Sequence, residues 1–249
     1  MSGAARQVGG RGGEWPWLTG AWLLATVAFT LVPGLSEWGE WSRRDGVGGG
    51  SAAGVASFAL RLIALCTCHF SHYGAGHLAS NALALLLTGV VIERSGAVTA
   101  TTAATAARAA KVADRRALLV ATVLAMPAIP LAIALLAPEM SHYRGASGIA
   151  SAWFVVALFA TWRRHADRPT RGLVVFAAVV FAAKLASEVG IDRSWFVPAT
   201  SSGFASVPLA HVIGAVCGAI VMLFARRAQS PDRRLLVTGR SEAVTKPTI

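Results

Sequence analysis

The apolar positions of this chain gather in long runs that are separated by short polar connections. Each run approaches the roughly 20 residues that an α-helix needs to cross the hydrocarbon core of a bilayer. This pattern predicts an all-α integral membrane protein with six transmembrane helices. The runs occupy about residues 17–33, 76–92, 117–137, 147–162, 172–189 and 206–225.

The connection between the first two runs, about residues 34–75, is too long for a simple loop. It contains a semi-apolar stretch from Val55 to Cys68 that Arg61 interrupts. An arginine at the centre of such a stretch costs roughly 2.5–3.5 kcal/mol on membrane-insertion scales, and a seventh span would destroy the alternation of charge described below. We therefore expect a first outer loop that is partly embedded in the bilayer.

Composition and charge favour lipid as the surrounding medium. Hydrophobic residues make up 55% of the 249 residues and charged residues 14%, whereas about 25% are charged in soluble proteins. The net charge of +11 could suggest a nucleic-acid partner, but the basic residues lie in short clusters between apolar runs and not in a patch with stacking aromatic residues. We expect no nucleic-acid binding.

The basic clusters alternate with connections that hold few basic residues. Residues 93–116, residues 163–171 and the tail are rich in Lys and Arg, and the positive-inside rule places such segments in the cytoplasm. The expected location is the bacterial inner membrane, with both termini cytoplasmic. The Ala/Thr-rich stretch 97–110 is expected to form a cytoplasmic loop or a short surface helix.

Three segments follow from this topology. Residues 1–16 are expected to be a cytoplasmic N-terminal segment, residues 17–225 the six-helix membrane domain, and residues 226–249 a basic cytoplasmic tail that has the composition of a disordered segment. No internal repeat divides the membrane domain.

Polar residues with reactive side chains lie inside two of the runs and at the start of a third. His77 and Asn81 are four residues apart and therefore lie on one face of a helix. Ser147 opens its run between Gly145 and Gly148; these glycines permit a tight entry into the helix, and the hydroxyl then lies at a helix N-terminus. Ionisable and amide groups are costly in hydrocarbon, so they are candidates for function.

The third group is His211 in the sixth run. Gly214 and Gly218 follow it on the same helix face, and small residues at this spacing allow close packing against a neighbouring helix. The fourth run offers Gly148, Ser151 and Ala152 as the facing positions. We therefore expect the fourth and sixth helices to pack closely together.

A serine nucleophile needs a base that accepts its proton and donors that hold the oxyanion of the tetrahedral intermediate. The second, fourth and sixth runs all start on the outer side, so their polar groups are expected to meet just below the outer surface, at a depth of roughly 7–8 Å. We predict Ser147 as nucleophile, His211 as base, and His77 and Asn81 as oxyanion donors.

Taken singly, each of these polar residues also has a structural explanation. Gly-x-Ser-Gly commonly serves close packing in membrane helices, and a buried His can bond to a neighbouring helix. In this order, however, they resemble the rhomboid family of intramembrane serine proteases. The resemblance covers about residues 58–225 and rests on His72, His77, Leu78 and Asn81, on Gly145-x-Ser147-Gly148, and on Ala210-His211 with Gly214 and Gly218.

The resemblance implies a six-helix rhomboid-like bundle and a Ser147/His211 dyad without a third, acidic member. It implies an endopeptidase that cuts transmembrane or membrane-anchored proteins near the outer membrane face, and no cofactor is expected. The alternative is a rhomboid-like pseudoprotease that binds or dislocates transmembrane segments without cleavage. A small transporter would need polar groups near the midplane of the bilayer, whereas these groups cluster toward one face.

Two further features are similar to the rhombosortase branch of that family, which is implied to remove C-terminal Gly-Gly sorting tails from C-terminally anchored proteins. They are Tyr143-Arg144 before Gly145, and the pair Lys184 and Glu188. The members of this pair are four residues apart, so they can neutralise each other within hydrocarbon as a structural ion pair.

Two weaker candidates lie in the outer connections. One is a zinc site formed by Cys66, Cys68, His69, His72 and His77, but Cys-x-Cys-His lacks the usual ligand spacing, and no metal centre is expected. His142 is close to Ser147 in sequence, but its loop is expected to project it outward, away from the hydroxyl.

Overall fold

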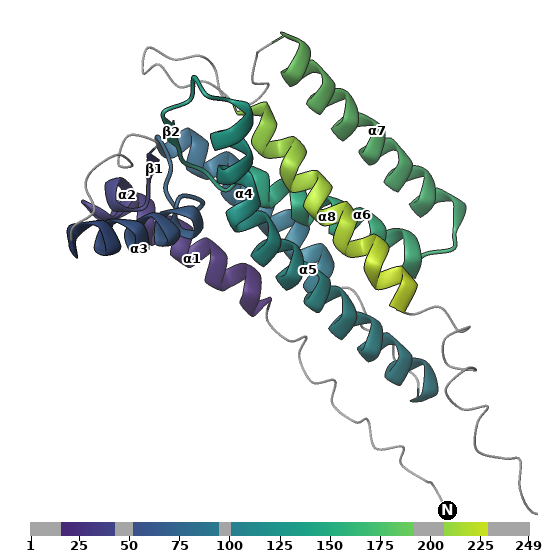
Figure 1. The fold of residues 1–249 in the computed structure, drawn as a ribbon. Coiled ribbons are helices and arrows are strands. Elements are labelled where there is room, and N and C mark those ends of the chain that lie inside the picture. The colour runs from purple at the N-terminus through teal and green to yellow at the C-terminus, as the bar shows by residue number, and fades with distance from the viewer. Residues whose placement is uncertain (1–15, 43–51, 95–100, 192–206, 229–249) are drawn as a thin grey trace, which may run out of the picture.

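The computed structural model describes residues 16–42, 52–94, 101–191 and 207–228, and these residues form a bundle of helices (Figure 1). The elements in chain order are α1 (Trp17–Leu31), α2 (Leu35–Trp38), β1 (Trp41–Ser42), α3 (Ala52–Thr67), α4 (Ala75–Arg94), α5 (Thr101–Leu136), β2 (His142–Tyr143), α6 (Ser147–Arg164), α7 (Arg168–Ile191) and α8 (Pro208–Ala228).

Every apolar run of the sequence is a helix. Within the described residues, α4, α5, α7 and α8 contain stretches that are long and apolar enough to cross a membrane, and α1 is a shorter apolar helix. The chain is therefore an all-α, multi-pass membrane protein. Most of the predicted N-terminal segment 1–16 and of the tail 226–249 lies outside the described residues, although α8 continues to Ala228.

The expectation for the Ala/Thr-rich stretch 97–110 was wrong from Thr101 onward. This part is neither a loop nor a separate short helix, because α5 runs without interruption for 36 residues to Leu136. Alanine has the highest helix propensity, and no glycine or proline occurs before Pro127. Asp114, which is 1% exposed, binds two arginines from the end of α6, Arg163 and Arg164, and so fixes this end of α5 to the bundle.

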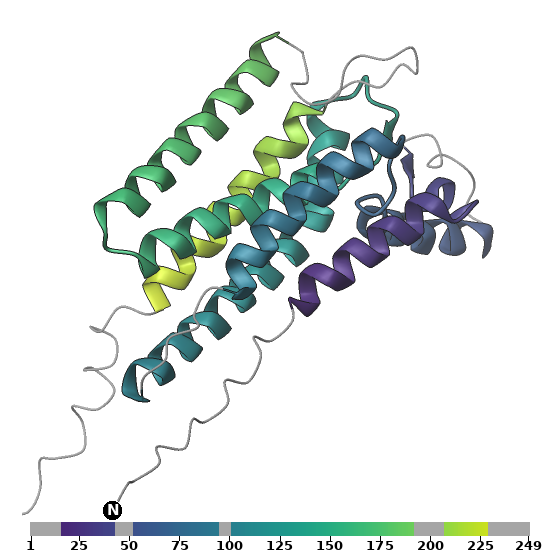
Figure 2. The same ribbon diagram turned by 180° about the vertical axis from the view of Figure 1, so that it is seen from behind.

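Helix α6 lies at the centre of the bundle, in contact with α4, α5, α7 and α8. Figures 1 and 2 show α1 on one side of these helices and α7 on the opposite side. Helix α7 is the least enclosed candidate span, since 11% of its apolar window is buried, against 39% for α8.

Helices α6 and α8 touch through their backbones, as predicted. A Cβ atom added at Gly218 would lie 2.6 Å from the carbonyl oxygen of Ala152, and one added at Gly214 would overlap the carbonyl oxygen of Gly148. Only glycine leaves space for this approach. The small residues after His211 therefore set the distance between the helices that carry His211 and Ser147.

The first outer connection contains α2, β1 and α3. Helix α3 has 16 residues and is not among the candidate spans of the described residues; it lies at one edge of the bundle beside α2 and β1, at an angle to the long helices (Figures 1 and 2). Its partial embedding in the bilayer stays a prediction. Strand β1 pairs antiparallel with β2, with Trp41 opposite Tyr143 and Ser42 opposite His142. This ladder joins the outer connection to the loop that precedes Ser147.

Candidate active site

Ser147 is the first residue of α6, and a glycine turn places it there. Gly145 has φ +131°, a conformation that residues with a side chain rarely adopt. A Cβ atom at this position would also lie 2.7 Å from Cε1 of the His77 ring. The turn therefore passes directly beside His77 and leaves half-buried Ser147 at the helix N-terminus, where backbone N–H groups lack helical partners.

Buried groups of the outer segment hold this turn in place. The N–H of Gly145 donates to the carbonyl of Cys68 at 2.9 Å, and the hydroxyl of Tyr143 donates to the carbonyl of Gly145 at 3.0 Å. His69 Nε2 lies 2.8 Å from the carbonyl of Met126. Burial lowers the pKa of His69, so this imidazole is neutral and binds as an N–H donor.

His72 supports the residue before the nucleophile. The N–H of Ala146 donates to His72 Nε2 at 3.4 Å, and His72 Nδ1 lies 3.2 Å from the hydroxyl of Thr30 in α1. Burial, and then the nearby His77, lower the pKa of His72 to about 3. A neutral ring with its proton on Nδ1 fits both contacts, because Nε2 is then the acceptor. His72 is thus a structural support of the turn.

His77 and Asn81 lie one turn apart in α4, and both are buried. They face the glycine turn, because a Cβ atom at Gly145 would lie 3.6 Å from Asn81 Nδ2. Within the described part of the chain, Asn81 Nδ2 is buried and has no hydrogen-bond partner. A buried donor without an acceptor costs roughly 1–3 kcal/mol. This amide is therefore available to an acceptor that enters the cavity beside it.

One cavity of about 620 Å³ brings the predicted residues together. One part of its wall is polar, and the remainder is apolar and formed by α4, α6 and α7, with side chains such as Leu87, Phe154 and Phe181. Polar groups inside a mostly apolar cavity are the usual form of a binding or active site. The polar wall includes His77, Asn81, Ser147, Lys184, Glu188 and His211.

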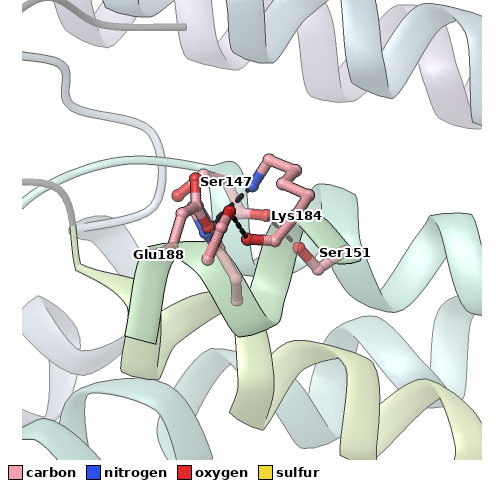
Figure 3. A network of polar contacts seen from close by, with 6 residues as sticks. Ser147, Ser151, Lys184 and Glu188 are labelled. Carbon is pink, nitrogen blue, oxygen red and sulfur yellow. Dashed lines mark hydrogen bonds and ion pairs between the residues drawn. The ribbon is translucent and has the colours of Figure 1, made fainter. Parts of the chain in front are cut away.

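His211 makes a contact that sequence reasoning missed. Its Nδ1 lies 2.7 Å from Oε2 of Glu188, and the same oxygen lies 2.8 Å from Nζ of Lys184. The predicted ion pair between Lys184 and Glu188 is confirmed, but it does not stand alone (Figure 3). The depth of the two residues in their helices could have indicated this contact. Glu188 lies three residues before the end of α7 at Ile191, and His211 lies three residues after the start of α8 at Pro208.

Ser147 and His211 line the same cavity from α6 and α8. Among the hydrogen bonds of the described residues, none joins Ser147 Oγ to His211, while the carbonyl of Ser147 accepts from the Ser151 hydroxyl at 2.9 Å. Hydrogen bonds between catalytic groups are often long without substrate and tighten in the Michaelis complex. The geometry fits a nucleophile and a base that are brought into contact when substrate binds.

The outer candidates lie away from this cavity. His142 is exposed and its Nδ1 lies 2.8 Å from Glu40 Oε1, so it projects outward, as predicted. Cys66, Cys68 and Cys217 are free thiols. In the described ranges, no three His, Cys, Asp or Glu side chains are grouped so that they could hold a metal ion.

Comparison with known proteins identifies the fold family. No curated protein and no solved structure matches the chain. The family model of the Rhomboid domain matches residues 59–228, which include the outer segment from the middle of α3 onward and every residue of the polar cavity wall. This match spans more than half of the 249 residues, and the chain therefore belongs to the rhomboid family of multi-pass intramembrane proteases.

Proposed function

We propose that the protein is an intramembrane serine endopeptidase in which Ser147 is the nucleophile and His211 the base. One observation carries this proposal: a single cavity between α4, α6, α7 and α8 gathers a serine at a helix N-terminus, an imidazole and a buried amide donor. These are the parts that acyl transfer requires. The family to which the chain belongs acts on membrane-embedded substrates.

In the proposed reaction, Ser147 Oγ attacks the scissile carbonyl carbon while its proton passes to His211. The carbonyl oxygen becomes an oxyanion. The intermediate then collapses, the C–N bond breaks, and the imidazolium gives its proton to the departing amine. A water molecule, deprotonated by the same imidazole, hydrolyses the acyl-enzyme and restores the Ser147 hydroxyl.

The oxyanion would be held by donors on two helices. The N–H of Ser147 lies at the N-terminus of α6, and Asn81 Nδ2 offers its buried N–H from α4. The His77 ring, which lines the same wall, completes the proposed oxyanion site. Such donors stabilise the transition state strongly, because they are fixed in advance and surrounded by little water.

The apolar part of the cavity suggests how substrate reaches this site. Its walls include Leu83, Ala84 and Leu87 of α4 and Leu173 and Phe181 of α7, so a substrate helix could approach between these two helices. A helix hides its carbonyls in i to i+4 hydrogen bonds and must unwind before attack. We propose that substrates are cut at their outer ends, where small residues make unwinding easy.

The full topology belongs to this proposal. Helices α1, α4, α5, α6, α7 and α8 would give six spans with both termini in the cytoplasm of a bacterium, in agreement with the basic clusters. The first outer segment would then dip into the outer leaflet. We propose further that the substrates are rhombosortase-like C-terminal tails, in which Gly-Gly precedes an apolar helix and a basic end, because glycines fit beside the crowded turn at Gly145.

The first experiment measures labelling of detergent-solubilised protein by a fluorophosphonate, which reacts with an activated serine. We expect labelling of the wild-type protein, and we expect Ser147→Ala and His211→Ala to lower proteolysis at least about 1000-fold, with the double variant no worse than either single variant. A folded wild-type protein that is not labelled and does not cleave would favour the pseudoprotease. Substantial cleavage by Ser147→Ala would exclude this nucleophile.

The second experiment tests the substrate and the orientation. A secreted reporter that carries Gly-Gly, an apolar helix and an Arg-rich tail is co-expressed with the wild-type protein or with Ser147→Ala, and the new C-terminus is mapped by mass spectrometry. We expect Ser147-dependent cleavage next to the glycines on the outer side. Cleavage on the cytoplasmic side would contradict the topology, and equal cleavage after both glycines are replaced by leucine would contradict the sorting-tail specificity.

A further inference from the structure

Three charged or titratable groups from α7 and α8 meet at one carboxylate oxygen. Glu188 is 1% exposed; its Oε2 lies 2.7 Å from His211 Nδ1 and 2.8 Å from Lys184 Nζ. Lys184 Nζ in turn lies 3.3 Å from His211 Nδ1. Figure 3 shows Lys184 and Glu188 together with Ser147 and Ser151 of α6, and all four residues line the same cavity.

We propose that Glu188 is a positioning residue that acts through His211 and converts the proposed dyad into a Ser147–His211–Glu188 arrangement, with Lys184 as the counter-ion of the carboxylate. This inference rests on the proposed function. The spacing of Lys184 and Glu188 alone suggests only a structural ion pair. The proposal adds that the Glu188 carboxylate orients the His211 imidazole.

The contacts decide which nitrogen of His211 carries the proton. A carboxylate only accepts hydrogen bonds and an ammonium only donates them. With the proton on Nδ1, His211 and Lys184 both donate to Glu188 Oε2, which satisfies both short distances. The hydrogen bond at one ring nitrogen fixes the tautomer of the ring. Nε2 is therefore left as the acceptor that the proposed reaction requires for the proton of Ser147.

The charges of the network also fit proton transfer. Glu188 lies in an apolar helix, and a lone carboxylate there would be costly. Lys184, one turn earlier on α7, neutralises it, so that the neutral imidazole contacts a balanced pair. When His211 takes the proton of Ser147, the new imidazolium faces a carboxylate 2.7 Å away, which stabilises the positive charge without protein movement. The ammonium of Lys184 is engaged by Glu188 and does not act as the base.

Other titratable groups line the same cavity: His77 on α4, and Tyr143 and Arg144 before α6. The contact that fixes the Nδ1 side of His211 is the one with Glu188 Oε2 at 2.7 Å, because Lys184 Nζ, at 3.3 Å from the same nitrogen, is itself a donor to Glu188. Glu188 Oε1 is buried and has no partner in the same part of the chain. The carboxylate is thus directed at His211 and Lys184 through a single oxygen.

The test separates a positioning role from a structural ion pair by reversing the pair. Lys184→Glu combined with Glu188→Lys keeps an i, i+4 ion pair on α7, but it places an ammonium donor at His211 Nδ1 and so favours the wrong tautomer. Glu188→Gln keeps the shape and removes the charge. The control is Val189→Ala, because Val189 is the next residue of α7 and is 64% exposed.

The measured quantities are the rate of fluorophosphonate labelling, kcat and KM on a transmembrane peptide, and the melting temperature in detergent. We expect Glu188→Gln and the reversed pair to lower kcat and labelling about 100-fold or more, with KM changed less than about threefold, because the loss concerns the transition state. Melting should stay within a few degrees of wild type for Glu188→Gln. Glu188→Asp should recover at least about tenfold over Glu188→Gln, and Val189→Ala should match wild type.

The outcomes separate this inference from the proposed function. If the wild-type protein is labelled and cleaves while Glu188→Gln or the reversed pair keeps its rate within about threefold, Glu188 belongs to a structural pair only and the inference is overturned, although the protease remains. If the reversed pair does not fold, the comparison of Glu188→Gln with Glu188→Asp decides. A folded wild-type protein without labelling or cleavage overturns both.

Discussion

Helices α8 and α7 both adjoin α6, but they are held against it in different ways. Helix α8 contacts α6 through backbone atoms at Gly214 and Gly218, whereas α7 contacts it through side chains such as Phe154 and Phe181, whose ring centroids are 4.7 Å apart. Helix α7 is also the candidate span with the smallest buried share, 11%. Backbone contact allows almost no variation in spacing, while a side-chain contact can open and close.

This difference separates two tasks within one site. Ser147 and His211 are carried by the pair of helices with the fixed spacing, which suits the short-range proton transfer that we propose for them. Glu188 and the apolar cavity wall belong to the helix with the adjustable spacing. Substrate entry and formation of the contact between Glu188 and His211 can therefore be coupled, because both depend on where α7 lies.

The largest expected effect comes from breaking the fixed contact. Gly214→Val places a side chain where the carbonyl oxygen of Gly148 lies, so α6 and α8 must separate. A displacement of roughly 1 Å at a reactive pair costs about 100-fold, and overpacking adds about 1–3 kcal/mol of instability. We expect a lower melting temperature and at least about a 1000-fold loss of cleavage.

The matched control for Gly214→Val is Gly172→Val in α7, where an added Cβ meets nothing within 4 Å. It should melt and cleave like the wild-type protein. A Gly214→Val protein with normal activity would show that the spacing of α6 and α8 is not fixed by this contact.

The next effect tests whether α4 belongs to the fixed part of the site. Asn81→Ala removes the buried amide donor beside the turn at Gly145. If this amide holds the oxyanion, kcat should fall about 100- to 1000-fold, with fluorophosphonate labelling reduced but not lost and melting little changed. A fall of less than about tenfold would assign Asn81 to a structural role.

A smaller effect concerns pH and the support of the turn. The pKa of His72 is lowered to about 3, against about 6.5 for an unfolded chain, so the unfolded state binds the proton first as pH falls. Stability is therefore complete above about pH 6.5 and decreases toward pH 3. We expect the melting temperature of wild type to fall between pH 7 and pH 4.

Substitution of the imidazole tests the origin of that acid sensitivity. His72→Asn can still accept from Ala146, but it does not titrate, so its melting temperature should fall less over the same pH range. His69 also has a lowered pKa because it is buried, and part of the decrease should remain. An identical pH dependence of wild type and His72→Asn would remove His72 as the cause.

The smallest expected effect tests whether the spacing between α7 and α6 is adjustable. Phe181→Ala removes one ring of the contact with Phe154, so α7 should separate from α6 more readily. We expect cleavage of a transmembrane substrate to rise about two- to fivefold if opening limits the rate, with a slightly lower melting temperature. Phe176→Ala is the control, since Phe176 lies on the same helix and is 65% exposed; it should leave the rate unchanged.

The parts of the fold that depend on local sequence could be predicted. Each membrane helix is encoded by a continuous apolar run, and the close contact of α6 and α8 by small residues at i, i+3 and i+7 after His211. The polar residues of the site could be predicted for a similar reason, because a polar side chain in an apolar run is conspicuous.

The remaining features depend on contacts between distant segments. The pairing of Trp41 with Tyr143 has no local signal in strands of two residues. The contact of Glu188 with His211 depends on which way α7 faces, and the sequence of α7 alone does not say which of its faces meets α8. Lys184, four residues before Glu188, already neutralises the carboxylate. The sequence therefore offered no reason to look for a second partner of Glu188 on another helix.

Glu93, at the end of α4, bears on where the domain begins. The carboxylate is fully buried and accepts from the backbone N–H groups of Leu18 and Thr19 and from the Thr19 hydroxyl, at distances between 2.5 and 3.3 Å. These donors precede the family match, which starts at residue 59. A fragment that began at residue 59 would lack all three of these donors and would leave the Glu93 carboxylate buried without them, so we expect such a fragment to be less stable than the full chain.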